Sequence, residues 1–212
     1  MQLIGMLDSP YVRRVAVSLQ LLSLPFEHRS VSVFRGFDSF RQINPVVRAP
    51  SLVCDDGAVL MDSGLILDYA EALAAPGRSL MPRDIAARQN ALRSLGLALA
   101  ACEKSVQIVY ERLVRPPEKQ HAPWVERVTD QMHTALRLLD ADVQRRPPGF
   151  PDGRPDQAFV TSAVVWHFAL ALLPDLLKPT DCPALHALSV RAEALPEFRR
   201  APHSEAVYPQ PG

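Results

Sequence analysis

The sequence predicts an α/β domain followed by an all-α domain, and three observations support this prediction. The first 75 residues alternate between short strand-like runs and helical patterns, and they end with a hairpin and a helix. Residues 76–83 (PGRSLMPR) contain Pro, Gly and Ser without periodicity, which is typical of a linker. Residues 84–212 show helical patterns and no strand candidate. We therefore expect an α/β domain over residues 1–75, a linker over 76–83 and a helical domain over 84–212.

The chain begins with MQLIGMLDSP, which passes from an apolar, strand-like run into a helix. Ser9 stands at the N-cap position, and Pro10 suits the first helical position because its missing N–H would have no intrahelical partner. Apolar side chains then recur at helical spacing, so Arg13 and Arg14 are expected on a solvated face. The Ser9 hydroxyl lies where a helix stabilises an anion, although capping alone also explains a serine there.

The rest of the α/β domain is expected from strand alternation, turn residues and one further cap. Asp55-Asp56-Gly57 between two apolar runs predicts a hairpin. Asp62-Ser63 offers the cap of the helix that follows. Cys54, in the first hairpin strand, is interpreted as a buried filler residue. The expected elements are a strand at Phe26–Phe34 with His28 on its surface, a short helix at Gly36–Ile43, and strands at Ser51–Cys54 and Ala58–Met61.

The helical domain is expected to contain three long helices and two short ones. Asp156 is the expected N-cap of the third long helix, but the residue three positions later is Phe159, so the reciprocal bond of a capping box is absent. Trp166 is expected in the core. The expected helices are Asp84–Leu113, Ala122 or Pro123 to Gln144, Gln157–Leu173, and shorter pieces near Pro183–Ala194 and Glu197–Arg200.

Composition argues against several classes of function. Lys plus Arg and Asp plus Glu both number 23, so no global field favours nucleic acid or an anionic membrane. The three cysteines and six histidines show no metal-ligand spacing, so no metal is expected. The opening residues lack the pattern of a signal peptide, and the apolar run Phe159–Leu173 is shorter than the roughly 20 residues of a membrane span. Reduced thiols and this pattern favour a cytoplasmic protein.

Four stretches together resemble the bacterial soluble glutathione transferases. They are SPYVRRV after the first strand, NPVVRAPSLV before the hairpin, Asp62-Ser63 at the start of the third helix, and DQAFVTSAVVWHF in the helical half. The resemblance covers nearly the whole chain. It implies a thioredoxin-like domain of order βαβαββα, an all-α domain that supplies the second-substrate pocket, and a homodimer.

The resemblance also implies a glutathione site. Pro50 would follow a cis peptide bond, and the main chain of Ala49 would pair with the cysteinyl unit of glutathione. Ser63 would hold the γ-glutamyl carboxylate and Asp62 the α-amino group. Ser9 would be the catalytic residue, donating a hydrogen bond that stabilises the thiolate. Arg48 and Phe34 complete the implied glutathione-binding set, and Tyr11 and Tyr110 are the candidates for the second-substrate pocket, with Tyr11 also the alternative to Ser9 at the thiol.

The implied function is a glutathione transferase that joins glutathione to a small, mostly apolar electrophile. Because a serine stands where related reductases carry a cysteine, conjugation, isomerisation or dehalogenation is favoured over disulfide exchange. A glutathione-dependent isomerase or dehalogenase on the same site remains an alternative. A non-catalytic binding protein of the same fold is the second alternative.

Overall fold

A computed structural model describes residues 1–205, and the chain forms two compact units. The first unit contains Met1–Leu80 together with the C-terminal segment that begins at Ala194, and the second contains Met81–Glu193. The sequence division placed that C-terminal segment in the helical domain. In the structure the segment groups with the α/β unit, because its side chains and main chain contact the first helix.

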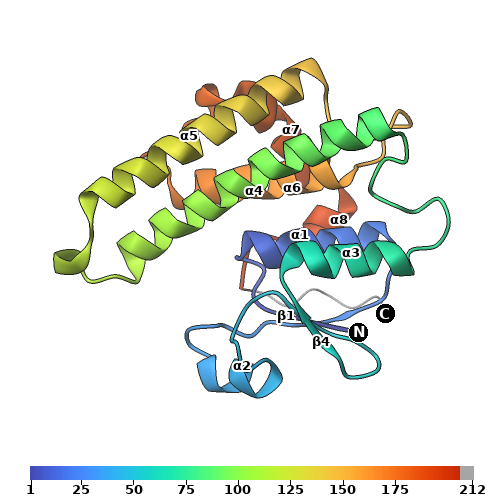
Figure 1. Cartoon of the computed structure of the whole chain (residues 1–212), viewed down its shortest axis with the longest axis horizontal. Helices are drawn as coiled ribbons and strands as arrows, with labels where there is room; N and C mark the ends of the chain where they lie inside the picture. Colours follow the sequence, from blue (N-terminus) through green and yellow to red (C-terminus); the bar gives the residue numbers. More distant parts are fainter. Residues whose placement is uncertain (206–212) are drawn as a thin grey trace. The chain divides into compact units, whose positions relative to one another are not determined.

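The first unit is a four-stranded sheet covered by helices, in the thioredoxin-like arrangement that the family resemblance implies. The strand order is β2-β1-β3-β4, with β1 parallel to β2 and antiparallel to β3, and with β3 antiparallel to β4. Helices α1 and α3 lie on one side of the sheet and α2 on the other (Figure 1). The elements are β1 (Gln2–Ile4), α1 (Pro10–Leu21), β2 (Glu27–Arg29), α2 (Phe37–Ile43), β3 (Ser51–Val53), β4 (Val59–Met61), α3 (Ser63–Leu73) and α8 (Pro196–Arg200).

The structure confirms the predicted hairpin turn and corrects the predicted length of the second strand. The predicted turn is confirmed: Gly57 has φ 89°, and Ala58 N–H donates to Asp56 Oδ1 at 2.9 Å. The expected strand Phe26–Phe34 is wrong in length, because only Glu27–Arg29 pairs with β1. The chain turns instead at Ser32, whose Oγ accepts hydrogen bonds from Phe34 N–H and Arg35 N–H, both at 3.1 Å.

The prediction that His28 lies on the strand surface is wrong. His28 is the middle residue of β2, and its side chain points into the unit, with 2% of the residue exposed. Its Nε2 is 2.7 Å from the Gly5 carbonyl oxygen. Burial lowers the pKa of His28 from its usual value, so the neutral ring is favoured in the folded chain.

The predicted solvated face of α1 is also wrong, since Arg13 and Arg14 are both buried. The C-terminal segment covers Arg13, whose Nε donates to the Ala201 carbonyl at 2.8 Å and whose guanidinium lies 5.6 Å from the centre of the Phe198 ring. Helix α1 contacts β1, α3 and α8, so the side chains of its middle turns are covered whether they are polar or apolar. The bonds of Arg14 belong to the candidate site below.

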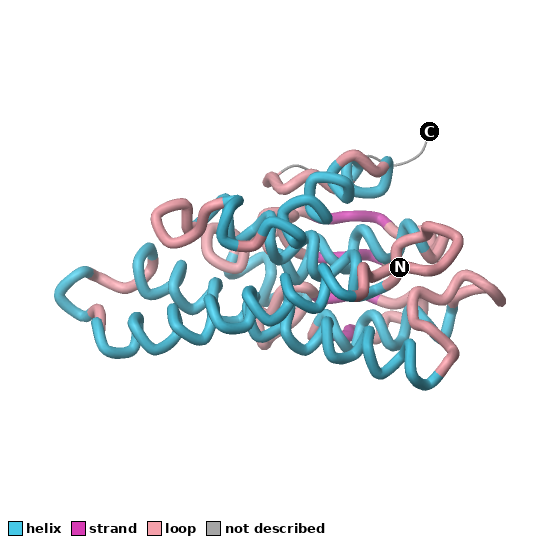
Figure 2. The backbone as a smooth tube through the Cα atoms, turned by 90° about the horizontal axis from the view of Figure 1, so that it is seen from above, coloured by secondary structure: helices cyan, strands magenta, loops and turns pink. Residues whose placement is uncertain are grey.

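The second unit is built from helices, and Figure 2 shows strands only in the first unit among the described residues. Helix α6 is buried over most of its length, and Trp166 lies in the core as predicted. The expected cap of α6 is confirmed, because Asp156 Oδ1 accepts from Phe159 N–H at 2.7 Å. The elements are α4 (Ile85–Leu113), η1 (Pro117–Lys119), α5 (Ala122–Arg145), α6 (Gln157–Leu172), η2 (Pro179–Asp181) and α7 (Pro183–Glu193). Within residues 1–205, no helix is long and apolar enough to span a membrane.

Candidate functional site

The start of α1 presents the Ser9 hydroxyl as the sequence predicts. Ser9 has extended backbone angles, and its Oγ accepts from Val12 N–H at 3.4 Å, which makes it the N-cap. In this bond the oxygen is the acceptor, so the hydroxyl hydrogen remains available to a ligand. Ser9 is half-buried. A hydrogen-bond donor at the positive end of a 12-residue helix favours a bound anion.

The Ala49–Pro50 segment packs near the same end of the sheet. The peptide bond between these residues is cis, as expected. A methyl group on Gly5, just after β1, would come within 3.2 Å of Ala49 Cβ and 2.6 Å of Val12 Cγ2, so the Ala49 loop and the first turn of α1 meet at this glycine. Among the described residues no hydrogen bond uses the main chain of Ala49. Its N–H and carbonyl oxygen are therefore available to a ligand with a peptide backbone.

The start of α3 is held by Asp62. Its Oδ1 accepts from Gly64 N–H at 2.8 Å and Leu65 N–H at 3.4 Å, and its Oδ2 lies 3.4 Å from Arg48 Nη2. The ion pair with Arg48 is exposed and adds little stability. Asp62 has φ 73° and ψ 122°, a conformation that costs a non-glycine residue about 1–3 kcal/mol and that is common at binding sites.

A buried arginine that sequence reasoning missed connects α1 to α3. Arg14 is 3% exposed, and its Nη1 donates to Ser63 Oγ at 3.0 Å. Because Ser63 accepts this bond, its own hydroxyl hydrogen is free to donate, and the guanidinium adds positive charge behind the helix start. The only sequence signal for Arg14 was a charge within an otherwise apolar helix.

The electrostatics next to Ser9 depend on Asp8. Burial raises the pKa of the Asp8 carboxyl above its usual value, and the nearby negative charge of Glu205 raises it further, while the Ser9 N–H and Arg35 lower it. Arg35 Nη2 is also 2.5 Å from Glu205 Oε1, and Ser30 Oγ donates to the Glu205 carbonyl at 2.8 Å. The described end of the C-terminal segment therefore lies close to the residue that precedes the α1 cap.

The remaining predicted residues are distributed over both units. Phe34 belongs to the exposed turn after β2 and is 54% exposed. Tyr11 is half-buried on the first turn of α1, whereas Tyr110, 46% exposed, lies on α4 in the second unit. Their assignment to a second-substrate pocket stays a prediction. The part of the chain that the structure describes contains no group of three His, Cys, Asp or Glu side chains placed to hold a metal ion.

The family-model match falls within the first unit of the chain. Residues 3–78 match the family model for the N-terminal domain of glutathione S-transferases. A solved glutathione transferase family member from Pseudomonas fluorescens Pf-5, with bound glutathione, is 31% identical, and the match covers 92% of this chain and 95% of that one with a TM-score of 0.79. The chain belongs to the glutathione transferase family.

Two further proteins are similar to this chain. A glutathione S-transferase from Methylobacterium radiotolerans JCM 2831, solved in complex with glutathione sulfonate, is 26% identical, with coverage of 100% of this chain and 95% of that one and a TM-score of 0.85. The uncharacterized GST-like protein YibF of Escherichia coli (strain K12) is 26% identical over 141 residues, 66% of this chain and 68% of YibF. The family-model match contains both helix starts described above and the Ala49–Pro50 bond between them in sequence.

Proposed function

We propose that the chain binds glutathione in its first unit and stabilises the glutathione thiolate for reaction with a small apolar electrophile. The observation that carries this proposal is the pair of helix starts at Ser9 and Ser63, which the Arg14–Ser63 hydrogen bond connects. Further support comes from the 31% identical relative, which was solved with bound glutathione.

Recognition of the tripeptide would use the charges and free main-chain groups of this site. The γ-glutamyl carboxylate would accept hydrogen bonds from the Ser63 hydroxyl and main-chain N–H, with the Arg14 charge behind them. The α-amino group would lie by the Asp62 carboxylate, and Arg48 and Phe34 would flank the peptide. The cysteinyl unit would pair with the unused N–H and carbonyl of Ala49.

The chemical role of Ser9 would be to stabilise a charge rather than to attack. Its hydroxyl would donate to the glutathione sulfur, so the thiol proton leaves to solvent more readily. A hydrogen bond to a charged acceptor is worth about 1.5–3 kcal/mol, or about one to two pKa units of the thiol. The thiolate then forms a carbon–sulfur bond with the electrophile while a leaving group such as a halide departs with the bonding electrons. The helix dipole adds to the same stabilisation.

The test separates binding from activation. Wild-type protein is applied to glutathione-agarose and assayed with a general aryl halide over a range of pH. Ser9→Ala should still be retained on the resin. In this variant the apparent pKa in the pH profile of kcat/KM for the aryl halide, measured at saturating glutathione, should rise by about one to two units. Ser63→Ala should lose retention. Asp84→Ala is the matched control, because Asp84 caps α4 through Ala87 N–H at 2.8 Å, and its loss removes a helix cap without touching the proposed site.

Each alternative has its own outcome in this assay. Retention of the wild type without turnover of any electrophile would favour the non-catalytic binding protein. On a wider panel that includes isomerisable and halogenated substrates, isomerisation without a glutathione conjugate as product would favour the isomerase, and halide release without a stable conjugate would favour the dehalogenase. A wild type that neither binds glutathione nor turns over would contradict the proposal. We further propose a homodimer, which light scattering tests independently of activity.

A further inference from the structure

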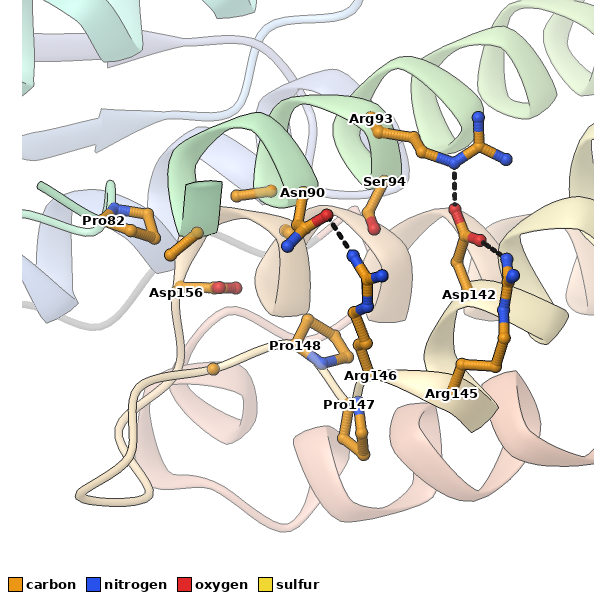
Figure 3. A pocket seen from close by; sticks show the side chains of 14 residues that line it. Pro82, Asn90, Arg93, Ser94, Asp142, Arg145, Arg146, Pro147, Pro148 and Asp156 are labelled. Atoms are coloured by element: carbon orange, nitrogen blue, oxygen red, sulfur yellow. Dashed lines mark hydrogen bonds and ion pairs between the residues drawn. The ribbon is translucent and has the colours of Figure 1, made fainter. Parts of the chain in front are cut away.

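The second unit contains a cavity that shares no residue with the proposed glutathione site. Its volume is about 410 Å³, within the range of small-molecule pockets. The beginning of α4, the end of α5 and the loop that leads to α6 form its walls (Figure 3). Pro147 and Pro148 supply an apolar wall, and the other side carries several polar side chains.

Three arginines line this cavity, and two of them share one buried carboxylate. Arg93 Nε donates to Asp142 Oδ2 at 2.7 Å, and Arg145 Nη2 donates to Asp142 Oδ1. Figure 3 shows both guanidinium groups converging on Asp142 at one end of the cavity. Two positive charges against one negative charge leave this cluster with a net charge of +1.

Arg146 adds a further charge that no carboxylate of the described residues neutralises. Its Nη1 donates to the side-chain oxygen of Asn90, which is a neutral acceptor. Figure 3 shows Arg146 reaching from the side of Pro147 and Pro148 to Asn90, beside Ser94. A guanidinium has five N–H donors, and this contact uses one of them.

The neighbours of Arg146 also offer donors in excess of acceptors. Asn90 accepts through its oxygen, which leaves its NH₂ group to donate, and no hydrogen bond of residues 1–205 uses the Ser94 hydroxyl. Asp156, the remaining carboxylate of the lining, is buried and receives the Phe159 N–H at the α6 cap. The lining therefore carries three guanidinium groups against two carboxylates, and both oxygens of Asp142, the side-chain oxygen of Asn90 and one oxygen of Asp156 already accept hydrogen bonds.

We propose that this cavity binds a small organic anion, whose carboxylate or phosphate group is held by Arg146, Asn90 and Ser94 while its carbon skeleton packs on Pro147 and Pro148. A planar guanidinium matches both anions with two parallel hydrogen bonds. The Arg93–Asp142–Arg145 cluster supplies additional positive potential along one wall. The site lies within Met81–Glu193 and does not depend on glutathione binding by the first unit.

Isothermal titration of the full chain, without glutathione, tests the site with three probes. Inorganic phosphate and succinate carry the two candidate groups, and succinamide is the neutral counterpart of succinate. We expect phosphate or succinate to bind with an affinity that falls as salt rises, and succinamide not to bind. The tighter of the two anions identifies the preferred group.

Two variants and one matched control make the result specific. Arg146→Gln should weaken anion binding about tenfold. Asn90→Asp should abolish binding, because the new carboxylate would neutralise Arg146 and repel the ligand. Arg137→Gln removes the same charge from an exposed position of α5 outside the cavity and should leave the affinity unchanged. The proposal is overturned if neither anion binds, if succinamide binds as well as succinate, or if Arg137→Gln weakens binding as much as Arg146→Gln.

Discussion

The Arg14–Ser63 hydrogen bond makes a sharp prediction about glutathione affinity. Arg14→Met removes the charge and the donor but keeps an unbranched side chain that can fill the buried space. Ser63 would retain its own hydroxyl, so the variant tests the contribution of the guanidinium rather than the helix start. We expect the variant to bind glutathione more weakly, because the γ-glutamyl carboxylate would lose a nearby buried positive charge.

The geometry sets the size of this loss. The bond from Arg14 Nη1 to Ser63 Oγ is 3.0 Å, and a hydrogen bond from Ser63 to the carboxylate would add about 2.7 Å. Unit charges about 5 Å apart attract each other by about 3 kcal/mol at an effective dielectric constant of about 20. Net values for hydrogen bonds to charged groups are about 1.5–3 kcal/mol, so the Kd for glutathione should rise about 10- to 150-fold.

The assay compares Arg14→Met with Arg13→Met by calorimetric titration with glutathione. Arg13 is the matched control because it is equally buried on the same helix but donates to Ala201 instead of to Ser63. Both variants should lower the free energy of unfolding, and only Arg14→Met should weaken binding. The pKa of the bound thiol should stay unchanged in both variants, because Ser9 remains in place.

Two results would refute this reasoning. One is an Arg14→Met protein that is folded and binds glutathione as tightly as the wild type. The other comes from the double variant with Ser63→Ala. The direct attraction between the guanidinium and the carboxylate survives Ser63→Ala, but the part of the Arg14 effect that passes through the Ser63 hydroxyl does not, so the two losses of affinity should be less than additive. Full additivity would show that the hydrogen bond between Arg14 and Ser63 contributes nothing to glutathione binding.

Three further predictions concern stability. Because burial lowers the pKa of His28, the unfolded chain binds more protons than the folded one, and stability is lost as the pH falls through about 6.5; urea unfolding of His28→Gln should show a smaller loss between about pH 7.5 and pH 5 than the wild type. Burial raises the pKa of Asp156, so the folded chain holds the carboxyl proton to higher pH than the unfolded chain, and stability falls as the pH rises above about 4. Asp156→Asn keeps a capping side chain that does not titrate, so its free energy of unfolding relative to the wild type should increase from about pH 4 to pH 7. A difference that stays constant over this range would contradict the raised pKa. Phe198→Ala should lower the free energy of unfolding by about 3–5 kcal/mol, because the ring is fully buried against Arg13, and Phe198→Leu should recover most of it; a loss below about 1 kcal/mol would show that α8 does not stabilise the first unit.

The sequence was sufficient for features that depend on near neighbours. The caps at Ser9 and Asp156 each involve a side chain and an N–H three residues later, and the Asp56–Gly57 turn is closed within its own hairpin. Helix periodicity likewise predicted α4, α5 and α6 to within a residue or two at each end. The length of the second strand could not be read in this way, because alternation after Arg29 continues although no partner strand lies beside it.

Only the tertiary structure decided which charged side chains are buried. Arg13, Arg14 and His28 read as surface residues because polarity is a property of the side chain, whereas burial depends on what covers it. The covering groups are far away in sequence: Ala201 lies 188 residues after Arg13, and Ser63 lies 49 residues after Arg14. The sequence alone therefore determined the two helix starts of the proposed glutathione site, and the fold determined that a buried guanidinium joins them.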